Sequence, residues 1–426
     1  MMERLPGFRD FYPEPLPRPE LWSADARQYL FDKWRATARR YSFREYDGPP
    51  LESLELFTTK SGEEIVGQLY NFVDKGERQI SLRPEMTPTL ARMVAQKQRE
   101  LPKPIRWWSF GPFWRYERPQ KGRTREFFQW NLDCIGADSP YADAEIVAIL
   151  AEFLRSVGLT SQQVGIKVNN RRLMKSQIES LGVAADKVEG VYRLIDKLDK
   201  LSPTDWLAYG KETVGLGDSE LERLRGMMGN REMWQQSEQL VAFFSLVKDL
   251  GVGDFVEFDP SVIRGLAYYT DMVFEVWDRQ GEFRAILGGG RYGNLLSDVG
   301  GEPMGGIGFA MGDVVISLVL EQYGLKPKLL PCPTRALVTV FSSDLIGVSA
   351  RVAAQLRAAG INTELYPEAV KLDRQLKYAN NNGIPFAIII GPDEAAANKA
   401  TVKNLAIGKQ ESVALIDLVA ALVPNR

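Results

Sequence analysis

The stretch FWRYERPQKGRTREFFQW, residues 113–130, lies where two segments rich in aromatic residues approach each other in the sequence. Alternation and aromatic content predict one strand over 105–115 and a second over 127–135. The polar loop between them is dense in arginine and lysine. Arginine presents a planar fork of donors that suits phosphate oxygens. The pattern therefore indicates an antiparallel strand pair with a polyanionic ligand, and a solvated basic turn is the alternative.

Polar side chains occupy alternate positions on both predicted strands. Arg115 and Glu117 fall on one face at the end of the first strand, and Phe127, Gln129 and Asp133 alternate along the returning strand. Alternate residues of a strand share a face. This combination is unusual for a core face, and it favours a pocket that holds a nucleotide together with a polar small molecule.

A second candidate is LRPEMTPTL, residues 82–90, where a predicted strand leads into a predicted helix. Thr87 has the character of an N-cap, with Pro88 at the first helical position. A carboxylate at Glu85 suits an ammonium group, although the helix dipole alone also favours a negative charge there.

A third candidate is IRGLAYYTDMVFE, residues 263–275. Arg264 precedes a glycine that allows close backbone approach. Tyr268 and Tyr269 point to opposite faces of a predicted strand. An edge arginine and a core tyrosine are the simpler interpretation. Further on, GGGRYG and GGIGFAMG are rich in glycine, and tight turns are the simpler interpretation of several of these residues.

Composition excludes several kinds of chemistry. The 426 residues include two cysteines and no histidine, and the net charge is −2. A cysteine zinc cluster, a disulfide scaffold and a Ser-His-Asp triad are therefore excluded. The sequence has neither a G-x-G-x-x-G fingerprint after a strand nor a P-loop. It contains no secretory signal and no apolar run long enough to span a membrane, so we expect a cytoplasmic location.

The organisation predicts two domains. Residues 1–328 form the first, with a mostly helical insertion at about 171–250, and 329–334 form a proline-rich linker. In residues 335–426 short apolar strands alternate with helices, which is typical of a separate α/β domain.

Four motifs, in this order, resemble the histidyl-tRNA synthetases, a family of class II aminoacyl-tRNA synthetases: LRPEMTPT, FWRYERPQKGRTREFFQW, RGLAYYTDMVFE, and GGGRYG with GFAMG. The resemblance covers nearly the whole chain. It implies an α+β fold, with an antiparallel sheet, flanking helices, a helical insertion and a C-terminal α/β anticodon-binding domain. Residues 41–57 resemble motif 1, which implies a homodimer.

The resemblance also implies the reaction. The substrates are L-histidine, ATP with Mg²⁺, and tRNA(His), and no protein metal ligand is assigned. By resemblance Arg115 holds the α-phosphate, Glu117 and Phe127 contact the adenine, and Arg123 reaches the outer phosphates. Arg264 lies against the α-phosphate and the substrate carboxylate, so Arg115 and Arg264 are the expected catalytic residues.

Histidine binding is assigned, by the same resemblance, to Glu85, Thr87, Gln129, Asp133, Tyr268 and Tyr269. The first three bind the α-amino group. Asp133 and Tyr269 read the two ring nitrogens, and Tyr268 lines the pocket.

The chain departs from the family pattern at three positions. Asp133 stands where the family often has glutamate, and Ala267 where it often has aspartate. Val315 replaces the arginine of motif 3, which leaves Arg291 or Arg123 as candidate substitutes. Two alternatives stay open. One is a non-catalytic regulatory subunit of ATP phosphoribosyltransferase, and the other is a class II synthetase for glycine, threonine or proline.

Overall fold

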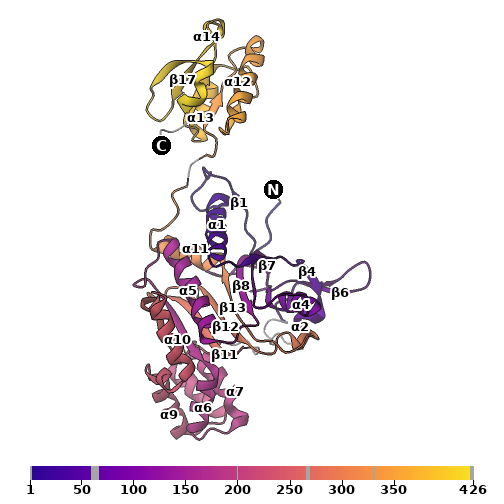
Figure 1. Cartoon of the computed structure of the whole chain (residues 1–426), viewed down its shortest axis with the longest axis vertical. Coiled ribbons are helices and arrows are strands. Elements are labelled where there is room, and N and C mark those ends of the chain that lie inside the picture. The colour runs from indigo at the N-terminus through magenta and orange to yellow at the C-terminus, as the bar shows by residue number, and fades with distance from the viewer. Residues whose placement is uncertain (1, 59–66, 199, 265–268, 330–331, 423–426) are drawn as a thin grey trace. The chain divides into compact units, whose positions relative to one another are not determined.

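The computed structural model describes residues 2–58, 67–198, 200–264, 269–329 and 332–422. Internal contacts divide the chain into two compact units, shown in Figure 1. The larger comprises Met1–Arg9 and Arg27–Lys326, and the smaller comprises Asp10–Ala26 and Pro327–Arg426. The smaller unit also includes a segment near the N-terminus, which the predicted division did not contain. The domain boundaries at 328 and 335 therefore stay predictions.

An eight-stranded sheet organises the larger unit, in the order β10-β9-β11-β12-β13-β8-β7-β3. Its strands are β3 (Arg44–Glu45), β7 (Ile105–Trp114), β8 (Glu126–Ile135), β9 (Val164–Asn170), β10 (Val256–Phe258), β11 (Tyr269–Asp278), β12 (Leu287–Tyr292) and β13 (Gly306–Gly312). The six inner strands pair antiparallel, and β3 and β10 join the edges in parallel. The predicted antiparallel sheet and α+β class are confirmed.

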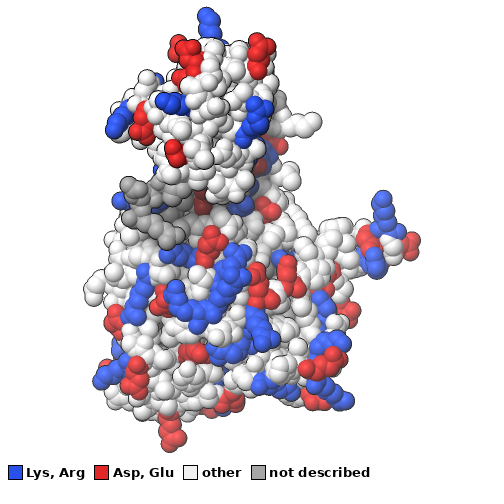
Figure 2. Space-filling view, turned by 45° about the horizontal axis from the view of Figure 1, so that its top comes forward, with Lys and Arg blue, Asp and Glu red and all other residues white. Residues whose placement is uncertain are grey.

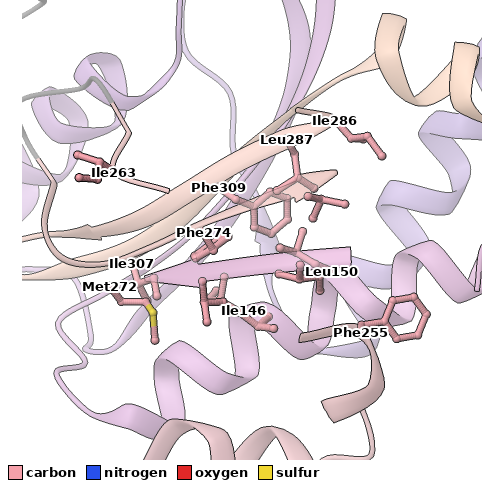
Figure 3. Packing of buried hydrophobic residues seen from close by; sticks show 14 of the residues in the cluster. Ile146, Leu150, Phe255, Ile263, Met272, Phe274, Ile286, Leu287, Ile307 and Phe309 are labelled. Atoms are coloured by element: carbon pink, nitrogen blue, oxygen red, sulfur yellow. The ribbon is translucent and has the colours of Figure 1, made fainter. Parts of the chain in front are cut away.

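Helices cover one face of this sheet. The larger unit contains α1 (Ala24–Arg40), α2 (Leu54–Thr58), α4 (Thr87–Lys97), α5 (Pro140–Ser156) and α11 (Asp313–Gln322). The first turn of α1, up to Ala26, is assigned to the smaller unit. The hydroxyl of Ser139 caps α5 by accepting from Ala142 N at 3.3 Å. Figure 3 shows Ile146 and Leu150 of α5 turned toward Phe274 and Phe309 of the sheet. This apolar face leaves the opposite face of the sheet for polar side chains.

The glycine run in β12 lies in a central strand, so the tight-turn alternative is wrong for these three glycines. Gly288, Gly289 and Gly290 are buried and pair with both neighbouring strands. A Cβ on Gly289 would overlap Gly308 O, and one on Gly290 would lie 2.6 Å from Met272 O. Glycine is required here because the neighbouring backbone and the side chains above it approach too closely for a larger residue.

A small sheet packs with α2 and α4 beside the main one. It has the order β4-β6-β5, with β4 (Leu51–Ser53), β5 (Asn71–Val73) and β6 (Gln79–Leu82). The prediction of Thr87 as an N-cap is wrong. The cap is Met86, which already has helical φ and ψ of −96° and −25° and offers no side-chain hydrogen bond. Thr87 is the first helical residue.

The segment between β9 and β10 is helical. It contains α6 (Arg171–Ser180), α7 (Val188–Asp196), α8 (Pro203–Glu212), α9 (Asp218–Met228) and α10 (Glu238–Asp249). Their buried residues join the core that α5 shares with the sheet. In the parts of the chain that are described, no helix is long and apolar enough to cross a bilayer.

The smaller unit contains a five-stranded sheet in the order β15-β14-β16-β17-β18. Its elements are β14 (Ala336–Val338), α12 (Ile346–Ala358), β15 (Thr363–Leu365), α13 (Leu372–Asn381), β16 (Phe386–Ile389), α14 (Pro392–Ala396), β17 (Lys399–Asn404), β18 (Gln410–Ala414) and α15 (Leu418–Leu422). The three strands at one side are parallel and the rest antiparallel. A two-stranded parallel sheet pairs β1 (Phe11–Tyr12) with β2 (Trp22–Ser23).

Candidate active site

A cavity of about 790 Å³ lies in the larger unit and is lined by residues of β8, β11, β12 and β13, with polar side chains coming mainly from β8 and β11. The predicted site residues that the structure describes all line it, namely Glu85, Thr87, Arg115, Glu117, Arg123, Phe127, Gln129, Asp133, Arg264 and Tyr269. Tyr268 and Ala267 lie outside the described residues. The alternating polar residues of β8 share one face because the strand is regular over its whole length.

Arginine side chains line one end of the cavity. Arg115 follows β7, and its Nε donates to Pro84 O at 3.0 Å. Its guanidinium lies 5.4 Å from the centroid of the Phe127 ring. Arg123, in the loop between β7 and β8, pairs with the carboxylate of Glu117 at 3.2 Å. This end therefore combines an aromatic face with fixed positive charge, the two features that a nucleotide needs.

Amide and carboxyl groups line the other end. Gln129 is buried, and its Oε1 has no hydrogen-bond partner among the residues described here. A buried acceptor without a partner is costly, so this atom is suited to a donor on a ligand. Asp133 is also buried and accepts a hydrogen bond from the hydroxyl of Tyr292 at 2.9 Å. Burial raises the pKa of Asp133 to about 7, although the bond from Tyr292 acts to lower it.

Arg264 enters the cavity from the segment before β11. Its backbone has φ +57°, a left-handed conformation that is uncommon for a residue with a side chain. Its Nη1 forms an ion pair with Glu275 of β11 at 2.9 Å. The guanidinium lies against the backbone of Gly288, where any Cβ would overlap it. The local strain and the close approach both fix this arginine over the sheet.

Glu85 and Thr87 reach the cavity from the junction between β6 and α4. Glu85 is buried and Thr87 is half-buried. A buried carboxylate near Gln129 provides acceptor oxygens for an ammonium group. Tyr269, at the start of β11, is buried beneath Arg264, whose guanidinium carbon lies 5.8 Å from the ring centroid.

Val315, at the motif 3 arginine position, is buried and lies beside the arginine-rich loop. Its Cγ2 lies 3.6 Å from where a Cβ on Gly122 would be, and both residues line the cavity. Arg291 does not replace the arginine, because it does not line the cavity. It is buried elsewhere and donates to Asp143 and Asp138.

Several lining residues were missed by the sequence reasoning. Asn131 and Tyr292 line the end that contains Gln129 and Asp133, Glu275 and Lys167 line the wall, and Arg284 lines the arginine end. Asn131 continues the alternation of β8, and Glu275 follows the period of two along β11, so both had a signal. Nothing in the sequence indicated that Lys167 and Arg284 line the cavity, because only the order of the strands in the sheet brings them there.

Comparisons with known proteins agree with this geometry. A family model described as histidyl-tRNA synthetase matches residues 21–313, and one described as anticodon binding domain matches residues 335–425. The histidine–tRNA ligase of Opitutus terrae is 38% identical over 418 residues, which are 95% of this chain and 94% of that protein. The chloroplastic/mitochondrial histidine–tRNA ligase of Arabidopsis thaliana is 37% identical, covering 97% of this chain and 85% of its own length.

A solved structure shows the same architecture. The histidyl-tRNA synthetase of a Nostoc species superposes with a TM-score of 0.82 at 26% identity, and the match covers 99% of both chains. The structural match covers nearly all of both chains, and the two family models match successive parts of this chain, so no large part of it is unmatched. The chain belongs to the histidyl-tRNA synthetase family of class II aminoacyl-tRNA synthetases.

Proposed function

We propose that the cavity activates histidine with ATP and transfers it to the 3′ end of tRNA(His). The observation that carries this proposal is the polarity of the single cavity. Arg115, Arg123 and Phe127 line one end, Gln129 and Asp133 line the other, and no wall separates them. Such a cavity holds a nucleotide and a small polar amino acid end to end, with the two reacting groups meeting between them.

The first step joins the two substrates. A carboxylate oxygen of histidine attacks the α-phosphorus of ATP, the bond between that phosphorus and the bridging oxygen breaks, and pyrophosphate leaves. Arg115 and Arg264 neutralise the charge that develops on the α-phosphate, and Arg123 holds the leaving phosphates. Phe127 stacks on the adenine, and Glu117 contacts its edge. A histidine base is not needed, because the attacking carboxylate is already ionised.

Selectivity comes from the other end. Glu85, Gln129 and Thr87 accept from the α-ammonium group. Asp133 and Tyr269 bond the two imidazole nitrogens, with Tyr268 beside them. A buried site that pairs both nitrogens rejects amino acids that lack them, because its own polar groups would be left unpaired.

Mg²⁺ is proposed to enter with ATP. The described part of the chain contains no cluster of three metal-ligating side chains. Glu117 and Glu275, the carboxylates nearest the arginines, are already paired with Arg123 and Arg264. The site thus fits a Mg²⁺ held chiefly by phosphate oxygens and water, which is the usual arrangement for this ion. The ion would neutralise phosphate charge.

Transfer to tRNA is proposed to use both units. The smaller unit carries the anticodon-binding match. Figure 2 shows Lys and Arg side chains gathered in the middle of the visible face of the larger unit, although the net charge of the chain is −2. A local basic surface supports contact with a polyanion. We also propose a homodimer through motif 1, where Leu51 is 44% exposed.

The decisive experiment is ATP–pyrophosphate exchange on the purified chain with each of the twenty amino acids. Exchange with histidine alone is expected, followed by charging of tRNA(His). The regulatory alternative is favoured only by Val315, and the cavity arginines and the C-terminal domain argue against it. Histidine binding without exchange would favour that alternative, and exchange with glycine, threonine or proline would favour a different synthetase.

A further inference from the structure

Arg284 lies in the segment between β11 and β12, and its side chain is exposed and lines the arginine end of the cavity. Arg115, Arg123 and Glu117 line the same cavity. Three guanidinium groups and one carboxylate therefore lie at this end. The excess positive charge repels itself unless an anion occupies the space between the groups.

The segment that carries Arg284 is held in place on both sides. On one side, Lys121 of the arginine-rich loop lies 4.7 Å from the centroid of the Phe283 ring. On the other, Ile286 is buried and its backbone N donates to Val276 O at 2.8 Å. Arg284 is thus positioned between two anchors, next to the loop that bears Arg123.

Its guanidinium has no hydrogen bond or ion pair to any residue that the structure describes. Arg123 differs, because it is already paired with Glu117. An arginine held near another arginine without a carboxylate of its own is arranged for an anionic ligand rather than for the fold.

We propose that Arg284 is a phosphate ligand for ATP, acting beside Arg123 on the two phosphates that leave as pyrophosphate. The proposal rests on the proposed function, because it assigns a residue to that nucleotide site. It also explains how the site operates with Val315 at the motif 3 position. The positive charge would come from the segment before β12 instead of from α11, where Val315 lines the same cavity.

The test measures histidine-dependent ATP–pyrophosphate exchange and ATP binding by calorimetry on the full chain and three variants. Arg284→Ala is expected to raise both the KM and the Kd for ATP by roughly tenfold to a hundredfold, as loss of a charge-assisted hydrogen-bond pair does. The KM for histidine should not change. Arg284→Lys should recover part of the loss. Arg223→Ala, which removes an exposed arginine of α9 far from the cavity lining, should behave as the unmodified chain.

The outcomes separate this proposal from the proposed function. An active chain whose affinity for ATP is unaffected by Arg284→Ala overturns the role of Arg284 alone. A variant with normal exchange but weak tRNA charging also overturns it, and assigns Arg284 to tRNA phosphates. If the unmodified chain binds ATP without exchange, the proposed function fails, while the calorimetric Kd of Arg284→Ala still decides the phosphate contact. If the unmodified chain does not bind ATP, both are overturned.

Discussion

Arg291, within the main sheet, and the arginines at one end of the cavity, in segments next to its strands, have opposite uses. Around Arg291, in β12, every donor direction is taken by the protein. Its Nε and Nη2 donate to Asp143 at 3.0 and 2.6 Å, its Nη1 donates to Asp138 at 2.9 Å, and the carbonyls of Ala137 and Ser139 accept at 3.0 and 3.2 Å. At the arginine end of the cavity, the ion pair among the described residues is that of Arg123 with Glu117 at 3.2 Å, and the side chains of Arg115 and Arg284 line the open space beside it.

The difference separates a structural charge from a functional one. Arg291 and Asp143 are both buried, so each compensates the desolvation of the other. The cavity arginines line open space, and Glu117 pairs with Arg123 alone, so most of their charge is available to an anion that enters. Neither the residue type nor the presence of a motif tells a structural arginine from a ligand-binding one, because GGGRYG and the arginine-rich loop both belong to family motifs. The number of hydrogen bonds that each guanidinium makes to the protein does distinguish them.

Replacing Arg291 gives the largest expected effect, and it should act on the fold. Arg291→Met leaves the carboxylate of Asp143 buried without its partner, so we expect a loss of about 3–5 kcal/mol in the free energy of unfolding, measured by urea denaturation. Burial already raises the pKa of Asp143 to about 6, so this carboxylate takes up a proton readily. The deficit should therefore shrink as the pH is lowered from 8 to 5.

The matched control for this variant is the double substitution Arg291→Met with Asp143→Asn, which removes both charges and should recover much of the stability. An Arg291→Met chain with unchanged stability but a raised KM for ATP would contradict the comparison, since it would place Arg291 in the nucleotide site.

Replacing Arg115 should lower the activity and leave the stability of the fold nearly unchanged, the converse of the result expected for Arg291. Arg115→Ala is expected to lower the rate of histidine-dependent pyrophosphate exchange by roughly 10²–10³-fold, because a fixed charge on the α-phosphate is lost. The urea midpoint should stay nearly constant, since the side chain of Arg115 donates one hydrogen bond within the described part of the chain, to Pro84 O, and the backbone bond to Arg125 O is kept in the variant. Unfolding at a lower urea concentration, in step with the activity loss, would show that Arg115 is also structural.

Much of the site was predictable because its residues follow local rules. Phe127, Gln129 and Asp133 share a face by the period of two, and a regular ten-residue strand preserves that register. The antiparallel pair on either side of the arginine-rich loop was predictable for the same reason. The α+β class followed from the resemblance, which joined four such local motifs in order.

What failed or was missed depends on neighbours that are distant in the sequence. The glycines of β12 look like turn residues, but they pair with β11 and β13, and they are glycine because Arg264, Phe274 and Tyr269 lie where a Cβ would be. Thr87 resembles an N-cap, but Met86 takes the cap position. Arg284 has no motif at all, and only the order of β11, β12 and β13 places it beside the arginine-rich loop.

A smaller effect is expected where a glycine positions a functional arginine. Gly288→Ala places a Cβ against the guanidinium of Arg264, the flexible end of a side chain, so the fold can adjust while the arginine moves. Exchange activity should fall by roughly tenfold to a hundredfold, as misplacement of a catalytic group does, with little change in the melting temperature. Gly226→Ala in α9, where a Cβ meets no neighbour within 4 Å, is the control. Full activity in Gly288→Ala would show that the position of Arg264 does not matter.

The smallest expected effect is a pH dependence of the KM for histidine, which should not appear in the KM for ATP. Because burial raises the pKa of Asp133 to about 7, its carboxyl is largely protonated at pH 6 and ionised at pH 8. An ionised carboxylate is the stronger acceptor for an imidazole N–H. The KM for histidine should therefore fall as the pH rises, beyond the change due to the imidazole of free histidine, whose pKa is about 6.5.

Asp133→Asn isolates this contribution, because free histidine titrates identically with both proteins. We expect the KM ratio of variant to unmodified chain to be near one at pH 6 and to rise to roughly fivefold at pH 8, while the KM for ATP stays the same. Stability gives an independent check with the opposite sign. A folded-state pKa above the unfolded value of 3.8 means that the carboxyl's contribution to stability is lost as the pH rises from about 4 to about 7. The Asp133→Asn variant should not show that loss of stability. A KM ratio independent of pH would show that the ionised Asp133 does not bind the substrate ring.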